Sequence, residues 1–317
     1  MKISAIVPVW NGRDLLARLM TTLEVQSLPV AEVLIVDNGS TDGAPEMARA
    51  RGARVIAMGH NAGFAAAVNR GIREAAHPLL AILNSDVELA PDYLQKLAEA
   101  GAPFATGKIL SPAGLLDGTF DMTCRGGTTW RCGAGQPDGP PYDQARDIHS
   151  PPWTAVLYRS EVFQMVGLLE ESFESYLEDA DFGLRCAAMG IVGRYLPDAR
   201  ATHVGSASLG RWHGETVRRM SRNQLLLVAR HWDGRFWWPV VVAQALWGGV
   251  ALRHGCGIAW ARGKCQGIRQ FANARRQSYH PVPAPLEKIF RDNERFICIK
   301  SSDAYWKLYF QLTGGAK

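Results

Sequence analysis

Short apolar runs alternate with stretches of helical spacing over the first hundred residues of the chain. The apolar runs predict strands at 3–9, 32–36, 54–58 and 79–83, and the helical spacing predicts helices at 14–26, 45–51 and 63–76. This alternation favours an α/β fold with a Rossmann-like, mostly parallel sheet, because strands buried on both faces by helices have near-continuous apolar sequences. We therefore expect ligands to bind beyond the carboxyl ends of these strands.

The pattern changes after the fourth predicted strand. Residues 111–152 are rich in Gly, Pro and Asp with little periodicity, and long irregular stretches in compact enzymes are usually functional loops. Ordered structure is expected again over 153–203, followed by a helix at 215–232. The next segment, 236–252, contains 17 residues without a formal charge.

The charge of the chain is unevenly distributed. Residues 253–317 carry 12 Lys and Arg against 4 Asp and Glu, whereas residues 1–252 carry 23 against 26. The overall composition, 47% hydrophobic and 21% charged, is that of a globular protein and argues against disorder. A basic C-terminal region on a near-neutral body predicts contact with an anionic surface, either phospholipid headgroups or nucleic acid.

The six cysteines show neither a Cys-x-x-Cys pair nor the spacing of a zinc site. Reduced thiols in a cytosolic protein are the plainer interpretation, and a disulfide between Cys124 and Cys132 is the alternative. The apolar run at the N-terminus is too short for a secretion signal, so we interpret it as the first strand.

Polar residues follow each of the four predicted strands: Asn11, Asp37, Asn61 and then Asn84 with Asp86. Asp37 can accept hydrogen bonds from a base or a ribose, although Asn, Gly and Ser beside it also form tight turns. Asp86 can ligate Mg²⁺ or Mn²⁺ through oxygen, or it can cap the turn that follows.

Acidic residues gather again in Glu178-Asp179-Ala180-Asp181. Three carboxylates within four residues, beside an apolar and aromatic segment, predict a catalytic or cationic partner. The alternative is a helix N-terminus that stabilises the negative charge. His203 is a lone histidine after a strand and, taken alone, is more often structural than a ligand.

The order and spacing of these motifs are more informative than any one of them. They are Val-Pro-Val-Trp-Asn-Gly (7–12), Val-Asp-Asn-Gly-Ser-Thr-Asp-Gly (36–43), Asn-Ala-Gly-Phe (61–64) with Asn69, Leu-Asn-Ser-Asp-Val (83–87), Tyr-Leu-Glu-Asp-Ala-Asp-Phe (176–182) and His203. Over residues 1–232 the chain resembles the family 2 inverting glycosyltransferases of the GT-A fold, and within them the rhamnosyltransferase-like branch.

This resemblance implies a role for each polar residue. Asp86 and His203 would ligate Mg²⁺ or Mn²⁺, and Asp179 would be the catalytic base, with Glu178 and Asp181 orienting the acceptor or the base. The residues expected to bind the nucleotide sugar are Pro8, Asn11, Asp37, Asn61, Asn69 and Asn84. One departure is Asn84, because the family's Asp-x-Asp motif has a carboxylate at that position, so the metal has fewer anionic ligands here.

The implied reaction moves a sugar, rhamnose being one candidate, from a nucleotide diphosphate sugar to a hydroxyl of a saccharide or lipid-linked saccharide in cell-surface polysaccharide synthesis. The metal would neutralise the departing diphosphate while Asp179 takes the acceptor proton, so no covalent intermediate is needed and the configuration inverts. We expect a nucleotide-sugar half at 1–110, an acceptor half at 111–232 and a basic, Trp-rich helical region at 233–317.

Two other functional classes explain parts of the sequence. A dinucleotide-dependent oxidoreductase explains Asp37, but it needs a Gly-x-Gly-x-x-Gly loop where Val-Trp-Asn-Gly-Arg-Asp stands. A non-catalytic nucleic-acid-binding protein explains the aromatic residues of the basic tail, because such interleaving suits base stacking. The tail holds no recognised nucleic-acid-binding module, so we expect no nucleic-acid partner.

The uncharged segment 236–252 has three interpretations. It is at the lower length limit for a membrane span, and Pro239, Gly248 and Gly249 interrupt it. Its tryptophans suit a membrane interface better than a hydrocarbon centre. A buried helix is the remaining alternative. We expect a cytoplasmic protein attached peripherally to the anionic inner face of the plasma membrane, and the sequence predicts no oligomeric state.

Overall fold

The computed structural model describes residues 1–204, 212–278 and 284–315. Two compact units are formed by the described residues. The N-terminal unit consists of Met1–Asp121 and Arg131–Ala207, and the C-terminal unit consists of Met122–Trp130 and Ser208–Lys317.

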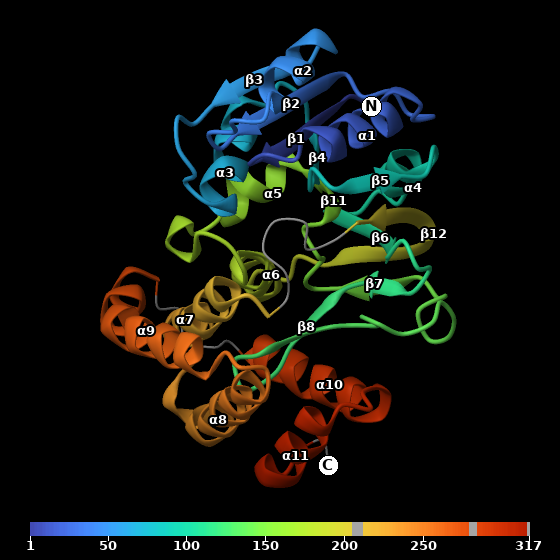
Figure 1. The fold of residues 1–317 in the computed structure, drawn as a ribbon. Coiled ribbons are helices and arrows are strands. Elements are labelled where there is room, and N and C mark those ends of the chain that lie inside the picture. The colour runs from blue at the N-terminus through green and yellow to red at the C-terminus, as the bar shows by residue number, and fades with distance from the viewer. Residues whose placement is uncertain (205–211, 279–283, 316–317) are drawn as a thin grey trace. The chain divides into compact units, whose positions relative to one another are not determined.

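The N-terminal unit is built on one main sheet with the strand order β10-β12-β6-β11-β4-β1-β2-β3, which can be followed in Figure 1. Strands β3, β2, β1 and β4 are parallel, and the antiparallel strand β11 separates them from the parallel pair β6 and β12. The prediction of an α/β fold with a mostly parallel sheet is thereby confirmed. The strand bounds are β1 (Ile3–Val9), β2 (Glu32–Asp37), β3 (Arg54–Ala57), β4 (Leu79–Leu83), β6 (Phe104–Leu110), β10 (Arg146–Ile148), β11 (Ala155–Arg159) and β12 (Gly193–His203).

Helices pack on both faces of this sheet, as the alternation of side chains along β1 shows. Val7 and Val9 point into the core formed with Leu16 and Leu19 of helix α1. Ile6 points the other way, against helix α3, where Gly71 leaves no room for a Cβ atom. Each large apolar side chain buried in this way contributes about 1.5–3 kcal/mol. The helix bounds are α1 (Arg13–Glu24), α2 (Ala44–Ala50), α3 (Phe64–Glu74), α4 (Tyr93–Glu99), α5 (Ser160–Val166) and α6 (Glu178–Ala188).

Short strands occupy the stretch that the sequence left irregular. Strand β7 (Leu116–Gly118) pairs with the end of β6, and β8 (Asp121–Thr123) pairs with β9 (Thr129–Arg131) in a separate two-stranded sheet. Strand β5 (Val87–Leu89) pairs with the end of β12. Strands of three residues are too short to show a periodicity, which is why the pattern did not predict them.

The C-terminal unit is helical, with α7 (Gly214–His231), α8 (Trp237–Arg253), α9 (Gly257–Ser278), α10 (Ala284–Lys300) and α11 (Ala304–Thr313). Helix α7 packs closely along α9 because Gly263 lies against the backbone of Arg218. Segment 122–130 joins this unit through Arg125, whose Nε donates to Glu294 Oε2 at 2.7 Å in a buried ion pair. Trp232 Nε1 donates to the Arg125 carbonyl oxygen at 2.7 Å.

Several predictions about the second half of the chain can be compared with this structure. The predicted helix at 215–232 is α7, and it belongs to the same compact unit as the C-terminal helices. Cys124 and Cys132 are both thiols, so the alternative disulfide is not formed. Segment 236–252 is α8, and within the described ranges no helix is long and apolar enough to cross a membrane.

Candidate active site

The loops after β1 and β2 form one hydrogen-bonded structure at the carboxyl edge of the sheet. The backbone N–H of Asn11 donates to Ser40 Oγ at 2.8 Å, and the side-chain Oδ1 of Asn11 accepts from the backbone N–H of Thr41 at 2.9 Å. Asp37, the last residue of β2 and 7% exposed, accepts from the Ser40 N–H at 2.9 Å. The structure therefore brings Asn11 and Asp37 together beside the buried Pro8 of β1, and their contact with a nucleotide stays a prediction.

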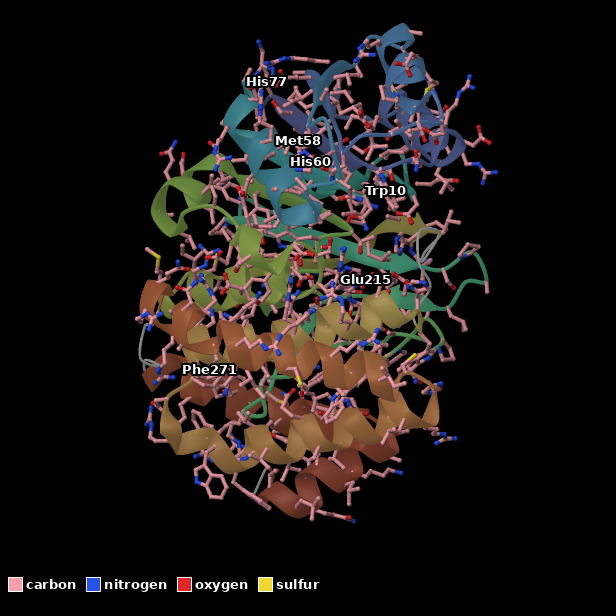
Figure 2. The ribbon with its side chains drawn as sticks, turned by 60° about the vertical axis from the view of Figure 1, so that its left-hand side comes forward. Trp10, Met58, His60, His77, Glu215 and Phe271 are labelled. Carbon is pink, nitrogen blue, oxygen red and sulfur yellow. The ribbon has the colours of Figure 1, made fainter. Side chains whose placement is uncertain are left out.

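The loop after β3 lies at the same edge, since the strands are parallel. Figure 2 labels Trp10 beyond β1, and Met58 and His60 beyond β3. Trp10 is 45% exposed and was not predicted as a site residue. Asn61 is exposed, and its Oδ1 accepts from the Gly63 N–H at 3.1 Å.

Asn69, on α3, is only 1% exposed and is fully engaged with the protein. Its Nδ2 donates to the Leu169 carbonyl oxygen and to Glu171 Oε1, both at 2.9 Å, and its Oδ1 accepts from the Leu169 N–H at 2.9 Å. The observed role of Asn69 is therefore to fix the 169–171 segment, and its contact with a nucleotide stays a prediction.

The segment that follows, 174–177, is strained and held against the start of α3. Glu174, Tyr176 and Leu177 have left-handed backbone angles, with φ of 61°, 74° and 69°. The Glu174 carbonyl oxygen accepts from the Ala65 N–H at 3.0 Å. Such non-glycine residues cost of order 1–3 kcal/mol each and persist only where the surroundings impose them, often at active sites.

Helix α6 begins directly after this strained segment, at Glu178 and Asp179. Glu178 is buried, and its Oε2 has no hydrogen-bond partner in the described part of the chain. Burial, followed by the charge of Asp179, raises the pKa of Glu178 well above its usual range. Burial and then the charge of Asp121 raise the pKa of Asp179 to about 6, against the lowering effect of Arg131.

Asp181 is completely buried and bonds to Arg185 on the same helix, with Nε to Oδ2 at 3.0 Å. The Arg185 guanidinium also donates to the carbonyl oxygens of Val166 and Leu168, at 2.9 and 2.8 Å. Asp181 therefore fixes α6 through Arg185, and its role in orienting the acceptor or the base stays a prediction.

A histidine between two carboxylates lies at the end of β12. The antiparallel pairing of His203 with Val87 places the preceding residue, Asp86, beside the imidazole. His203 Nε2 lies 3.1 Å from Asp86 Oδ1, and Nδ1 lies 2.9 Å from Oδ2 of Asp117 on β7. Burial lowers the pKa of His203, but the hydrogen bonds to Asp117 and Asp86 outweigh it and raise the pKa to about 9.

The residues at this position fit a divalent cation. The 3.1 Å between Asp86 Oδ1 and His203 Nε2 is a hydrogen-bond distance, so a bound ion would replace the proton on Nε2 and take the carboxylate oxygen and the imidazole nitrogen as two of its ligands. Asp117 occupies the second nitrogen, the usual arrangement for a metal-bound histidine. Among the described residues no three acidic, His or Cys side chains converge on one point, so an ion bound here would take further oxygens from substrate or water.

Asn84 follows β4, and its N–H donates to the Thr154 carbonyl oxygen at 2.9 Å. The sequence did not predict Asp117, Asp121 or Arg131. Arg131 Nη2 lies 3.0 Å from Asp121 Oδ2 and 3.6 Å from Asp179 Oδ2. The single signal for these three residues was the irregular composition of 111–152, which marked the stretch as functional without distinguishing its members.

Residues 4–101 match the family model described as glycosyl transferase family 2. The matched residues contain β1 to β4 and the site residues from Asn11 to Asp86. They form a family 2 glycosyltransferase domain. This glycosyltransferase is 28% identical over 270 residues to the N-acetylglucosaminyl-diphospho-decaprenol L-rhamnosyltransferase of Mycobacterium tuberculosis, an alignment that covers 75% of this chain and 87% of the relative. It is also 31% identical over 229 residues to the O-antigen biosynthesis protein RfbC of Myxococcus xanthus, covering 65% of this chain and 18% of that protein.

Solved structures of other glycosyltransferases share the fold. GalNAc-T7 in complex with UDP, GalNAc and Mn²⁺ aligns with 86% of this chain at a TM-score of 0.63 and 14% identity. This chain spans 56% of the GalNAc-T7 chain. The mannosyltransferase of Pyrobaculum calidifontis, in complex with GDP-mannose and Mn²⁺, aligns with 98% of this chain and 84% of its own at a TM-score of 0.51 and 13% identity. The GT-A fold and the family predicted from the motifs are confirmed.

Proposed function

We propose that this glycosyltransferase moves a sugar from a nucleoside diphosphate sugar to a hydroxyl of a saccharide or lipid-linked saccharide, with inversion at the anomeric carbon. Asp179 carries the proposal, because its 16%-exposed carboxylate lies in the first turn of α6, which follows the strained segment 174–177. Its pKa of about 6 leaves it ionised at neutral pH and still able to accept a proton. A general base is most effective when its pKa lies near the working pH.

The donor nucleotide binds at the carboxyl edge of β1 and β2, where Asn11 and Asp37 are held together. The half-exposed ring of Trp10 offers a face on which a nucleobase can stack. Pro8, Asn61 and Asn84 line the same edge, and Asn69 supports it by fixing the segment before α6.

Asp86 and His203 hold a Mg²⁺ or Mn²⁺ ion in this proposal, and Asp117 fixes the imidazole through Nδ1. The ion, when bound, supplies positive charge that favours departure of the diphosphate. Asn84 stands where a second carboxylate is expected, so it adds an amide oxygen and no charge to this position.

Asp179 takes the proton of the acceptor hydroxyl as the oxygen attacks the anomeric carbon and the bond from that carbon to the diphosphate oxygen breaks. One displacement occurs, so the configuration inverts and no sugar is bound covalently to the protein. Burial and the charge of Asp179 raise the pKa of Glu178 well above its usual range, which favours its protonated form beside the base. Its buried, unpartnered Oε2 makes it the group we assign to orienting the acceptor or Asp179.

We further propose rhamnose as the sugar and a diphosphate-linked lipid saccharide as the acceptor, within cell-surface polysaccharide synthesis. The support is the relative from Mycobacterium tuberculosis, whose name states an L-rhamnosyltransferase acting on N-acetylglucosaminyl-diphospho-decaprenol. The aligned residues cover 87% of that relative and 75% of this chain, so the proposal compares most of both chains.

The test is nucleotide release from dTDP-rhamnose, UDP-sugars and GDP-sugars, measured with Mn²⁺ and a lipid-linked N-acetylglucosamine acceptor. We expect release from one nucleotide class, loss of release with excess EDTA, and the same loss in Asp86→Ala and His203→Ala. Asp147→Asn is the matched control, because this carboxylate is 69% exposed and pairs only with Arg194 among the ion pairs described. Full activity in excess chelator contradicts the metal site, and no release from any donor contradicts the function.

We also propose that the C-terminal unit attaches the enzyme to the anionic inner face of the plasma membrane, leaving it cytoplasmic and peripheral. The exposed positions of α8 before its final residue are all uncharged: Trp237, Trp238, Val241, Ala245, Gly249 and Leu252. Helix α11 adds Leu308 and Leu312, which are 42% and 48% exposed, and Trp238 Nε1 donates to the Leu312 carbonyl oxygen at 3.0 Å. Two neighbouring helices therefore present a joint apolar surface.

Helix α11 lies within, and α8 directly before, the region that carries the positive charge of the chain, 12 Lys and Arg against 4 Asp and Glu over 253–317. Apolar burial at the lipid interface combined with basic residues near anionic headgroups, worth about 1 kcal/mol each, is how peripheral helices bind membranes. A lipid-linked acceptor is located at such a surface.

A further inference from the structure

Arg131, at the end of β9, lies between two carboxylates of the N-terminal unit. Its Nε and Nη2 donate to Asp121 Oδ1 and Oδ2 at 3.1 and 3.0 Å, a two-pronged pair with a carboxylate that is 4% exposed. The same Nη2 is 3.6 Å from Asp179 Oδ2. A side chain of the irregular stretch thus contacts the proposed base, 48 positions later in the sequence.

The position of Arg131 is fixed on two sides. Asp121 on β8 holds the guanidinium, and β8 pairs with β9. Gly118 on β7 lies under the aliphatic stem, where an added Cβ atom would be 2.6 Å from Arg131 Cδ and 2.9 Å from Cγ. A residue larger than glycine at position 118 must therefore displace the arginine.

We infer that Arg131 is a positioning residue that holds the Asp179 carboxylate in place and keeps it ionised for proton transfer. This inference rests on the proposed role of Asp179 as the base. If Arg131 only stabilised the β8–β9 pair, its bidentate pair with Asp121 would be sufficient. Its Nη2 also lies within ion-pair distance of Asp179, which a purely structural role does not require.

The ionisable groups around Asp179 make the expected effect definite. Arg131 favours its ionised form, whereas burial and the charge of Asp121 oppose it. Glu178 is coupled to it from the same helix, and Tyr158 faces it from β11. The remaining charged groups nearby are Asp181 with its partner Arg185 on α6, and Asp117 on β7, which acts on Arg131.

Removing the guanidinium therefore raises the pKa of Asp179, and removing the Asp121 charge lowers it. An opposite charge at 4–6 Å moves an Asp pKa by about 1–3 units, and the guanidinium is shared with Asp121, so we expect the low end of that range.

The test is the pH dependence of kcat/KM for sugar transfer, read at the acidic limb. Arg131→Gln should move this limb up by about one pH unit, and Asp121→Asn should move it down. Arg131→Lys keeps the positive charge but cannot form the bidentate pair with Asp121, so it should shift the acidic limb by an intermediate amount. Arg194→Gln, which removes an exposed arginine paired with Asp147, is the control and should leave the limb in place.

Gly118→Ala is a second way to remove the contact between Arg131 and Asp179, because it displaces the aliphatic part of Arg131 while every charged group remains. It should move the limb in the same direction as Arg131→Gln. A limb that stays at the wild-type pH in both variants, with circular dichroism showing both folded, overturns the inference.

A failure of the proposed function gives a different experimental result from a failure of the positioning role. If Asp179→Asn retains transfer, Asp179 is not the base and the proposed mechanism fails, whatever the arginine variants do. If Asp179→Asn is inactive and the wild-type limb is present but unmoved by Arg131→Gln and Gly118→Ala, the mechanism stands and the positioning role is wrong.

Discussion

Replacing Gly63 with alanine tests how the start of α3 positions the strained segment before the proposed base. Gly63 has φ 89° and ψ 170°, a conformation that is essentially restricted to glycine. An added Cβ atom would lie 2.7 Å from the Glu174 carbonyl oxygen and 2.9 Å from its Cα. Both contacts are with backbone, so a side-chain rotation cannot relieve them.

Two costs combine in Gly63→Ala. The strained backbone costs about 1–3 kcal/mol, and the clash costs about 1–3 kcal/mol as other overpacked substitutions do. A unit of this size loses roughly 2–4 °C of Tm per kcal/mol, so we expect a loss of at least about 5 °C. Because segment 174–177 leads directly into Glu178 and Asp179, kcat should fall as well.

The assay is a thermal melt followed by circular dichroism, together with kcat and KM for transfer. Gly59→Ala is the matched control, because Gly59 has φ 79° in the same loop and an added Cβ would meet nothing within 4 Å. It carries the backbone cost without the clash and should retain kcat. If Gly63→Ala and Gly59→Ala have equal Tm and equal kcat, the close approach does not position the catalytic segment.

The other predictions concern the metal, the base and the membrane. Asp117→Asn keeps an oxygen for His203 Nδ1 but loses the charge, so Mn²⁺ affinity, measured by electron paramagnetic resonance with a nucleoside diphosphate present, should fall about tenfold; an affinity equal to that of Asp147→Asn would remove Asp117 from the site. The rate of wild-type transfer should decline as pH falls through about 6, since the ionised form of Asp179 is then lost. A transfer rate that does not change down to pH 5 disagrees with Asp179 as the base. The double variant Val241→Asp, Leu308→Asp should no longer float with anionic liposomes at low salt, whereas Ile299→Asp, which alters an isoleucine 74% exposed on α10, should float like wild type. Wild-type protein that does not float with anionic liposomes at low salt contradicts membrane attachment through the α8 and α11 surface.

Local pattern was sufficient to predict the first half of the fold. The strands at 3–9 and 79–83 agree with β1 and β4 at both ends, and the other two early strands and the three helices agree within two residues at each end. Each of these strands is a continuous apolar run, and that pattern follows directly from burial on both faces of a parallel sheet. Strands β7 to β10 were missed because each has three residues, too few to show an alternation of apolar and polar positions.

The site could be predicted only where a motif marked it. Asp86, Asp179 and His203 stood in recognisable order, and the structure places Asp86 beside His203 through the pairing of β5 with β12. Asp117 and Arg131 have no local pattern, because each acquires its partner through the fold: Asp117 meets a histidine 86 positions later, and Arg131 meets Asp179. Charge and exposure of single residues in a loop do not reveal such contacts.

Asn69 illustrates a different limit of sequence reasoning. The motif identified the residue, but the structure uses its whole amide to fix the 169–171 segment. A polar side chain at the end of a sheet can serve a ligand directly or support the segment that does, and the two roles produce the same residue in the sequence.

The most direct test of the mechanism compares Asp179→Asn with wild type in two measurements on one preparation. Sugar transfer should fall by about 10²–10⁴-fold, the usual contribution of a general base. Donor affinity, measured by calorimetry with Mn²⁺ and a nucleoside diphosphate sugar, should remain within about twofold, because the Asn side chain has the same shape and acts on the acceptor side. Transfer above about a tenth of the wild-type rate, with unchanged donor affinity, would contradict the assignment of Asp179 as the base.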